Sequence, residues 1–133
     1  MENLAVAGVD ITSEASRASL SKMLMGLFDH WGLDSEKRLM LLGLSPTNRA
    51  SLSNYKKGAP LPNSTDLLDR AGHLLSIHKS LRILFPHDRH IVYGWVTAAN
   101  KAFNGKTPLD VMIERKFVGV LMVRAYLDTA RGR

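Results

Sequence analysis

The stretch RLMLLGLSPTNRASLSNYKKG, residues 38–58, decides the fold, because it sets two helical signals side by side with almost no loop between them. A leucine-rich run ends at Gly43, and glycine is the usual left-handed residue just past a helix. Ser45 and Pro46 follow, a favoured pair for the N-cap and first turn of a new helix. The pattern predicts one helix that ends at Gly43 and a second from Pro46 to about Lys57, crossing the first sharply.

The charges of this stretch favour a polyanionic partner. Five basic residues and no acid lie between positions 37 and 65: Lys37, Arg38, Arg49, Lys56 and Lys57. Two short helices joined by a tight turn, the second polar and basic, have the outline of a helix-turn-helix unit that reads DNA. The alternative is a basic face that only contacts water.

Individual side chains of the second helix suit DNA contact. Lys56 and Lys57 would meet phosphates, while the amides of Asn48 and Asn54 can read adenine edges. Capping or plain solvation is the alternative for both asparagines. The predicted DNA-binding residues are Thr47, Asn48, Arg49, Ser51, Asn54, Lys56 and Lys57. Leu52 and Tyr55 are expected on the buried side of the same helix.

A first helix precedes this pair. Thr12 or Ser13 caps it, Gly32 ends it after Trp31, and Asp34 or Ser35 caps the next helix. Its expected core face is Leu20, Met23, Leu24, Leu27, Phe28 and Trp31. Residues 1–12 show no period and are expected to form a loose arm.

The segment GAPLPNS, residues 58–64, is the clearest boundary in the chain, because prolines cannot continue a helix. It predicts a domain at 1–60 and another at 61–133. A long helix opens at Asn63 or Ser64 and stops at Pro86, with an apolar stripe wide enough to touch two neighbours. The stripe is Leu67, Leu68, Ala71, Leu74, Leu75, Ile77, Leu81, Leu84 and Phe85.

Local signals divide the rest of the chain into short helices. Asp88 caps a helix through Trp95 to about Asn100, residues 104–105 form a turn, and Thr107 opens a helix by a variant of the capping box. The segment FVGVLMV, residues 117–123, has strand propensity, but no second strand is there to pair with it and its apolar spacing continues as in a helix. We therefore expect an all-α fold, with Trp95 and Phe103 most simply in the core.

Composition excludes several classes of function. There are no cysteines, hence no disulfide, thiolate metal site or cysteine nucleophile. No apolar run of membrane-spanning length and no signal peptide occurs, which indicates a soluble cytoplasmic protein.

His87 and His90 alone suggest a metal or acid-base pair. A closed metal site needs further ligands, so we prefer the interpretation that Asp88 caps a helix between two surface histidines. We expect no enzyme activity and no cofactor. The methionines Met23, Met25, Met40, Met112 and Met122 are expected in the core.

The second half of the chain resembles a known family. The residues that carry the resemblance are the run from Leu67 to Phe85, then Trp95, Asn100, Phe103, Gly105 and Pro108-Leu109, and the closing segment VRAYLDTARG at 123–132. They resemble the Xre/MbcA/ParS antitoxins, and Gly43, Tyr55 and Gly58 fall where the Xre-like helix-turn-helix of these proteins would place them. The resemblance covers residues 13–133.

This resemblance implies an antitoxin with two partners. The N-terminal helices would bind the operator of its own operon, and a helical C-terminal domain would bind a RES-domain toxin, an enzyme that consumes NAD, and obstruct its active site. The toxin-binding residues would be Arg124, Tyr126, Asp128, Arg131, Gly132 and Arg133. The alternative is a stand-alone helix-turn-helix regulator without a toxin. Because 117–123 is apolar on several sides, we also expect a homodimer.

Overall fold

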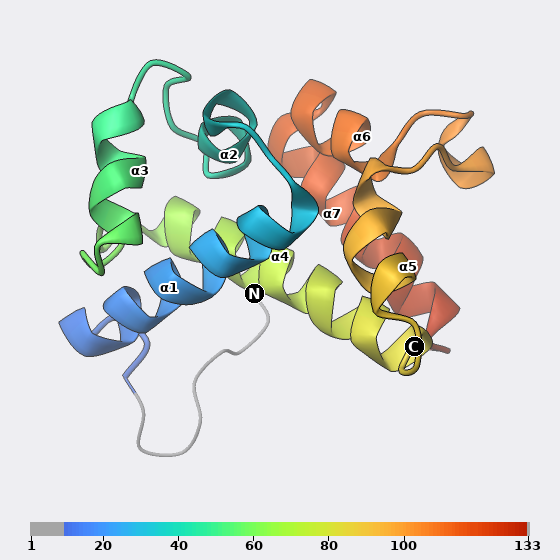
Figure 1. The fold of residues 1–133 in the computed structure, drawn as a ribbon, viewed down its shortest axis with the longest axis horizontal. Coiled ribbons are helices and arrows are strands. Elements are labelled where there is room, and N and C mark those ends of the chain that lie inside the picture. Colours follow the sequence, from blue (N-terminus) through green and yellow to red (C-terminus); the bar gives the residue numbers. More distant parts are fainter. Residues whose placement is uncertain (1–9, 133) are drawn as a thin grey trace. The chain divides into compact units, whose positions relative to one another are not determined.

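The computed structural model describes residues 10–132, and its regular elements there are all helical (Figure 1). They are α1 (Glu14–Trp31), α2 (Ser35–Leu41), α3 (Arg49–Lys56), α4 (Thr65–Leu84), α5 (Arg89–Gly94), the 3-10 turns η1 (Trp95–Thr97) and η2 (Lys101–Phe103), α6 (Pro108–Glu114) and α7 (Lys116–Ala130). The all-α prediction is confirmed. The chain forms two compact units that meet inside α4, one ending at Gly72 and the other beginning at His73. Most of the arm expected at 1–12 lies outside the described residues.

The caps of the first unit are those that the sequence predicts. The Ser13 hydroxyl accepts the Ser16 N–H at 3.1 Å, and the Asp34 carboxylate accepts the Lys37 N–H at 2.9 Å. Gly32 ends α1 with φ +69°, a conformation that costs glycine little. Just before α1, the hydroxyl and backbone N–H of Thr12 both donate to Asp10 and hold the pKa of that carboxyl below its ordinary value.

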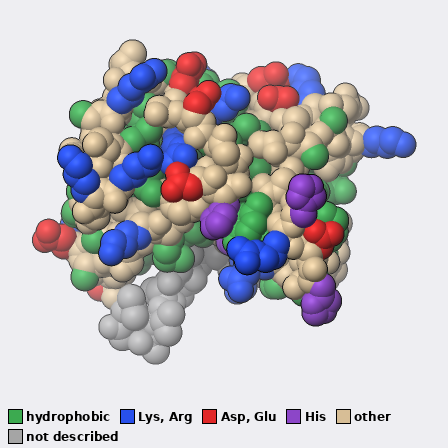
Figure 2. All heavy atoms as spheres, in the orientation of Figure 1, with side chains coloured by type: hydrophobic (Ala, Val, Ile, Leu, Met, Phe, Trp, Pro, Cys, Tyr) green, Lys and Arg blue, Asp and Glu red, His purple; other side chains and the backbone are tan. Residues whose placement is uncertain are grey.

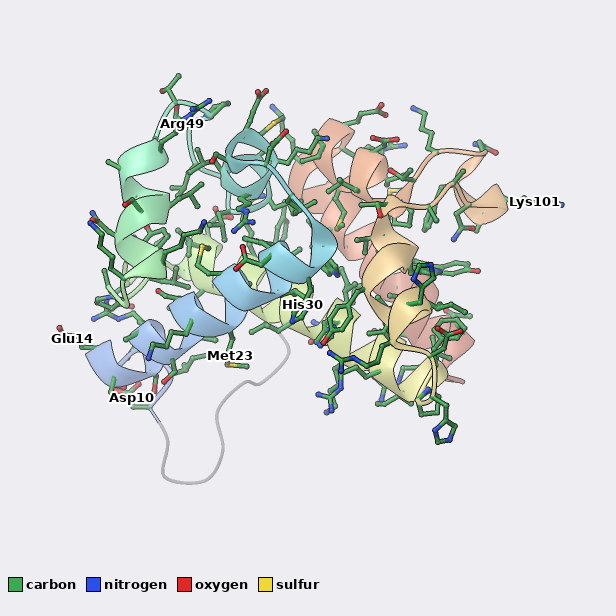
Figure 3. All side chains as sticks on the ribbon, viewed as in Figure 1. Asp10, Glu14, Met23, His30, Arg49 and Lys101 are labelled. Atoms are coloured by element: carbon green, nitrogen blue, oxygen red, sulfur yellow. The ribbon has the colours of Figure 1, made fainter. Side chains whose placement is uncertain are left out.

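The core of the first unit gathers around α1. Leu24, Phe28, Leu39 and Leu61 are fully buried, and five of the six residues expected on the core face of α1 are buried. Met23 is the exception, since 54% of it is exposed and its side chain projects away from the helix (Figure 3). The prediction of a buried Met23 is wrong, whereas Met25 is buried as expected.

The proline-rich segment belongs to the first unit by its packing. Arg17 donates to the Leu61 carbonyl at 2.7 Å, and the Ser21 hydroxyl donates to the Ala59 carbonyl at 2.7 Å. These bonds hold residues 59–61 against α1, and the two compact units divide at Gly72. The domain bounds 1–60 and 61–133 remain a prediction.

The connection between α2 and α3 differs from the prediction. Gly43 has φ +73° just past α2, as expected, but α3 begins at Arg49 and not at Pro46. The Ser45 hydroxyl lies 2.9 Å from the Thr47 hydroxyl, and the Asn48 N–H donates to the Ser45 carbonyl at 3.0 Å. Ser45 thus closes a local turn and does not cap a helix, so the connection is longer than the sequence pattern indicates.

The second unit contains the end of α4 and the helices that follow. Asp88 caps α5 through the Ile91 N–H at 3.1 Å, and Thr107 and Asp110 form the expected capping box of α6. The expected helix through Asn100 is wrong: α5 gives way to η1, and Ala98 is extended. The Asn100 side chain caps η2 through the Ala102 N–H at 2.9 Å, so it begins a turn where we expected a helix to end. The turn at 104–105 is confirmed, with positive φ at both residues.

Helices α6 and α7 pack unusually close at Gly119. A Cβ atom there would collide with the Val111 carbonyl and lie 3.0 Å from the Met112 Cα, and both neighbours are backbone. Val120, Val123 and Leu127 of α7 are buried on the same side. The choice of helix over strand for 117–123 is confirmed, and glycine is what permits the approach.

Candidate DNA-binding and protein-binding surfaces

The outer face of α3 is polar and basic. Leu52 and Tyr55 are buried, as predicted, which turns Arg49, Asn54, Lys56 and Lys57 toward solvent. Arg49 stands at the start of α3 with its side chain directed outward (Figure 3). Several Lys and Arg side chains lie over this helix in the space-filling view (Figure 2). A row of cations on one exposed helix face suits phosphate contact.

The amide of Asn48 is held at the entrance to α3. Asn48 occupies the N-cap position without a side-chain cap bond, and its Oδ1 accepts the Ser51 hydroxyl at 2.9 Å. This bond fixes the amide plane, while an amide oxygen retains a second lone pair and the nitrogen two hydrogens. The group therefore has the donor and acceptor needed at an adenine edge. Thr47, also predicted to contact DNA, is exposed in the preceding turn.

Ser53 also lies on this surface, although it is not among the predicted DNA-binding residues. Ser53 is exposed, and it lies four residues after Arg49 and four before Lys57, so the three share one stripe of α3. This four-residue spacing is visible in the sequence and was the signal that could have identified Ser53.

Arg38 does not belong to the basic surface. It is 8% exposed, donates to the Leu33 carbonyl at 2.9 Å, forms an ion pair with Asp29 at 2.7 Å, and places its guanidinium over the Phe28 ring. Its charge is paired within the first unit, although its buried Nη1 has no hydrogen-bond partner among the described residues. Of the five cations counted between positions 37 and 65, Arg38 therefore adds no exposed charge to this surface.

The C-terminal residues expected to bind a toxin fall into two groups. Arg124 is buried, its guanidinium donating to His73 Nδ1 at 2.7 Å and pairing with Asp128 at 3.7 Å. Any influence of Arg124 on a partner would therefore act through the neighbours that it holds in place. Tyr126 is 40% exposed and Asp128 half-buried, so both are available to a partner.

Tyr126 completes an aromatic cluster with Trp95 and Phe103. Its ring stacks on Trp95 at 6.1 Å between centroids, and Phe103 lies 5.4 Å from Tyr126 and 6.5 Å from Trp95. All three are at least partly accessible, so Trp95 and Phe103 are not fully buried core residues as expected. Partly exposed clustered aromatics are typical of protein interfaces.

The C-terminal end of α7 is tied to α4. Arg131 donates to the Ser80 hydroxyl at 3.1 Å, and Ser80 itself is 1% exposed. Gly132 follows with φ +82°, which turns the chain off the helix. Arg133 lies outside the described residues. The guanidinium of Arg131 is therefore held on the second unit.

The remaining outer face of α7 is apolar. Val118, Leu121 and Met122 are 56%, 38% and 37% exposed, which makes the prediction of a buried Met122 wrong. With Ala125 and Tyr126 they lie within one side of the helix. We call these five residues the α7 apolar face. Continuous apolar surface of this kind is typical of faces that contact another protein.

The histidine pair has no metal-binding geometry. His87 and His90 are exposed on either side of Asp88, whose carboxylate caps α5 as expected. Within residues 10–132, no three His, Asp or Glu side chains are grouped to hold a metal ion. No helix in that range is long and apolar enough to cross a membrane.

Comparison with known proteins assigns both units. Residues 10–76 match the antitoxin Xre-like helix-turn-helix domain, and residues 80–133 match the antitoxin Xre/MbcA/ParS C-terminal toxin-binding domain. The fold is therefore a helix-turn-helix domain followed by a helical toxin-binding domain. The chain is also 35% identical, over 129 residues and 96% of both sequences, to the uncharacterized protein y4oB of Sinorhizobium fredii. This chain belongs to the Xre/MbcA/ParS antitoxin family, and the predicted resemblance is confirmed.

Proposed function

We propose that this chain neutralises a RES-domain toxin that consumes NAD and that it represses its own operon. The match of residues 80–133 to a toxin-binding domain carries the proposal. Two surfaces of the second unit support it, namely the accessible aromatic cluster around Tyr126 and the anchored end of α7.

In this proposal, the antitoxin enters the toxin's active site and obstructs it. The last residues suit this role, because Gly132 lacks a Cβ and Arg133 brings a cation. A site that binds the phosphates of NAD is rich in donors, so an arginine there would meet a carboxylate or stack on an aromatic ring. The bond from Arg131 to Ser80 would fix where the two final residues emerge.

Repression would use α3 in the major groove of the operator. Asn48 and Asn54 would read base edges, with Thr47 and Ser51 beside them, while Arg49, Lys56 and Lys57 contact phosphates. A homodimer would match a two-fold operator, and the exposed Val118, Leu121 and Met122 offer a surface that a second copy can cover. Acting on operator DNA and on the toxin, the protein would work in the cytoplasm.

An NAD-consumption assay tests the proposed inhibition. The purified toxin from the neighbouring reading frame should consume NAD alone and lose that activity when the full-length chain is added. A chain lacking Gly132 and Arg133 should still bind the toxin but leave much of its activity, whereas Arg133→Lys should inhibit nearly as well as the original. Full inhibition by the shortened chain contradicts the blocking tail, and loss of binding makes the tail an anchor.

The second candidate function is a helix-turn-helix regulator without a toxin. It accounts for the basic face of α3 equally well. A neighbouring gene product that is not toxic by itself and does not co-purify with this chain would favour it.

A further inference from the structure

A groove in the second unit has an apolar floor and a cationic rim. It has a volume of about 620 Å³ and lies where the end of α4 meets α5. Ile83, Phe85 and Val92 contribute apolar surface, and Lys79, Arg82 and Arg89 bring positive charge. None of the described residues that line it is acidic. In the space-filling view, Lys and Arg side chains gather beside hydrophobic atoms over this part of α4 (Figure 2).

The three cations of the groove are available to a ligand. All three side chains are exposed, and none forms an ion pair with another described residue. The guanidinium of Arg89 lies over the Tyr93 ring, 5.9 Å from its centroid, which holds it at the wall of the groove. The nearest acid in sequence, Asp88, is engaged by the Ile91 N–H as the cap of α5. The groove thus carries an uncompensated positive charge.

The apolar floor distinguishes among anionic ligands. Ile83 is 48% exposed, and burying it against another apolar side chain is favourable, which phosphates of DNA cannot do. Two aromatic rings line the groove: Tyr93 is already stacked with His78, 5.5 Å between centroids and 19° between planes, and Phe85 is half-buried in the floor. Acidic side chains that flank an apolar anchor satisfy both the rim and the floor. The groove therefore favours a protein segment over a nucleotide.

We propose that this groove binds an acidic segment of the toxin through one apolar anchor seated on Ile83. The proposal rests on the proposed function, since the toxin supplies the segment, and seven of the eight lining residues fall within the toxin-binding match at 80–133. Opposite charge across a rim speeds encounter and fixes orientation, while the apolar anchor slows dissociation. The groove would then add affinity apart from the tail that obstructs the active site.

Calorimetric titration of the purified toxin into the full-length chain tests the groove. Arg82→Glu combined with Arg89→Glu should weaken binding about tenfold at low salt and reduce its salt dependence. Ile83→Asp should weaken binding by a similar factor at any salt, because it places a charge on the floor. Operator affinity, measured on the same samples, should stay unchanged for both variants.

Lys101→Glu is the matched control, because Lys101 is an exposed cation of the same unit that projects away from its neighbours and does not line the groove (Figure 3). It should bind the toxin within about twofold of the original. Circular dichroism melts identify any variant that fails to fold, and Arg82→Ala with Arg89→Ala then replaces the charge reversal. Unchanged toxin binding by the groove variants overturns this proposal alone. If the groove variants lose operator affinity and not toxin affinity, the groove is a DNA-binding surface and the proposal is also overturned. If the original chain does not bind the toxin, both this proposal and the proposed function fail.

Discussion

Helices α3 and α7 both bury one side, yet their outer sides have opposite chemistry. On α3 the exposed positions are, apart from Ala50, polar or basic: Arg49, Ser53, Asn54, Lys56 and Lys57. On α7 the exposed positions from Val118 to Tyr126 form the α7 apolar face, and the only charged side chain between these two residues is the buried Arg124. The two helices therefore suit different partners, a polyanion for α3 and the surface of another protein for α7.

Helices α3 and α7 differ in the residues at their exposed positions and not in helix propensity. Burial of Leu52 and Tyr55 orients α3 just as burial of Val123 and Leu127 orients α7. Because the buried residues orient each helix, the exposed residues make no core contacts. Their chemistry can therefore suit a binding partner. Variants of one helix should therefore affect one partner only.

Gly119→Ala should have the largest effect and should damage only the second unit. Because the atoms in the way are backbone, α6 and α7 must separate, and the free energy of unfolding should fall by about 3 kcal/mol. Urea unfolding followed by circular dichroism measures it. Gly26→Ala is the control, since no atom apart from its chain neighbours and the backbone of its own helix lies within 4 Å of the new Cβ. Alanine also favours helix, which predicts a gain of about 0.5–1 kcal/mol. Equal stability of the two variants would refute the close approach of α6 and α7.

Lys56→Ala combined with Lys57→Ala should have the second largest effect, which is to weaken DNA binding by α3. Each lost phosphate contact removes about 0.9 from the slope of log affinity against log salt, so the slope should flatten by roughly 1.8. Fluorescence anisotropy of operator DNA over a salt series gives the slope. Lys101→Ala, an exposed lysine of the other unit, should leave it unchanged. If the double variant keeps the salt slope of the original chain, the DNA-binding surface lies elsewhere.

Asn48→Ala should reduce sequence discrimination and leave the salt slope intact. If its amide reads a base edge, the preference for operator over random DNA should fall by roughly 1–3 kcal/mol. Ser51→Ala removes the bond that holds the amide and should show a smaller loss in the same direction. Equal loss on both DNAs in a competition assay would show that Asn48 only positions the protein.

Ser80→Ala should have the smallest effect, confined to the end of α7. It removes the acceptor of Arg131, a bond that contributes on the order of 1 kcal/mol to the free energy of unfolding. Ser19→Ala, an exposed helical serine, should change stability by less than about 0.5 kcal/mol. Thermal melts compare them, and identical behaviour would mean that Arg131 does not anchor the tail.

Local signals in the sequence predicted most of the fold. Asp34, Asp88 and Thr107 cap helices because their bonds close within three residues, which short-range patterns capture. Ser45 was predicted wrongly as a cap for the same reason. Its hydroxyl can cap a following helix or bond within a local turn, and in the structure it bonds with the Thr47 hydroxyl. The helical state of 117–123 was predictable because no strand existed to pair with it.

Contacts distant in sequence limited prediction of the sites. Arg124 appears as one more cation in a basic tail, but His73, 51 positions earlier, binds it inside the second unit. Arg131 likewise meets Ser80 across 51 positions. Met23 lies at helical spacing with the core of α1, and only the packing of the neighbours shows that the core does not extend to it. Spacing identifies which residues share a face, and tertiary packing decides which face is covered.

The most direct test of the two-partner account measures two variants against both partners. Lys56→Ala with Lys57→Ala alters α3, and Tyr126→Ala removes the exposed ring of the aromatic cluster. Operator affinity by anisotropy and toxin affinity by calorimetry are measured for each folded variant. The account predicts that the lysine variant loses operator affinity alone and that Tyr126→Ala loses about tenfold in toxin affinity alone. Loss of the same partner in both variants would contradict it.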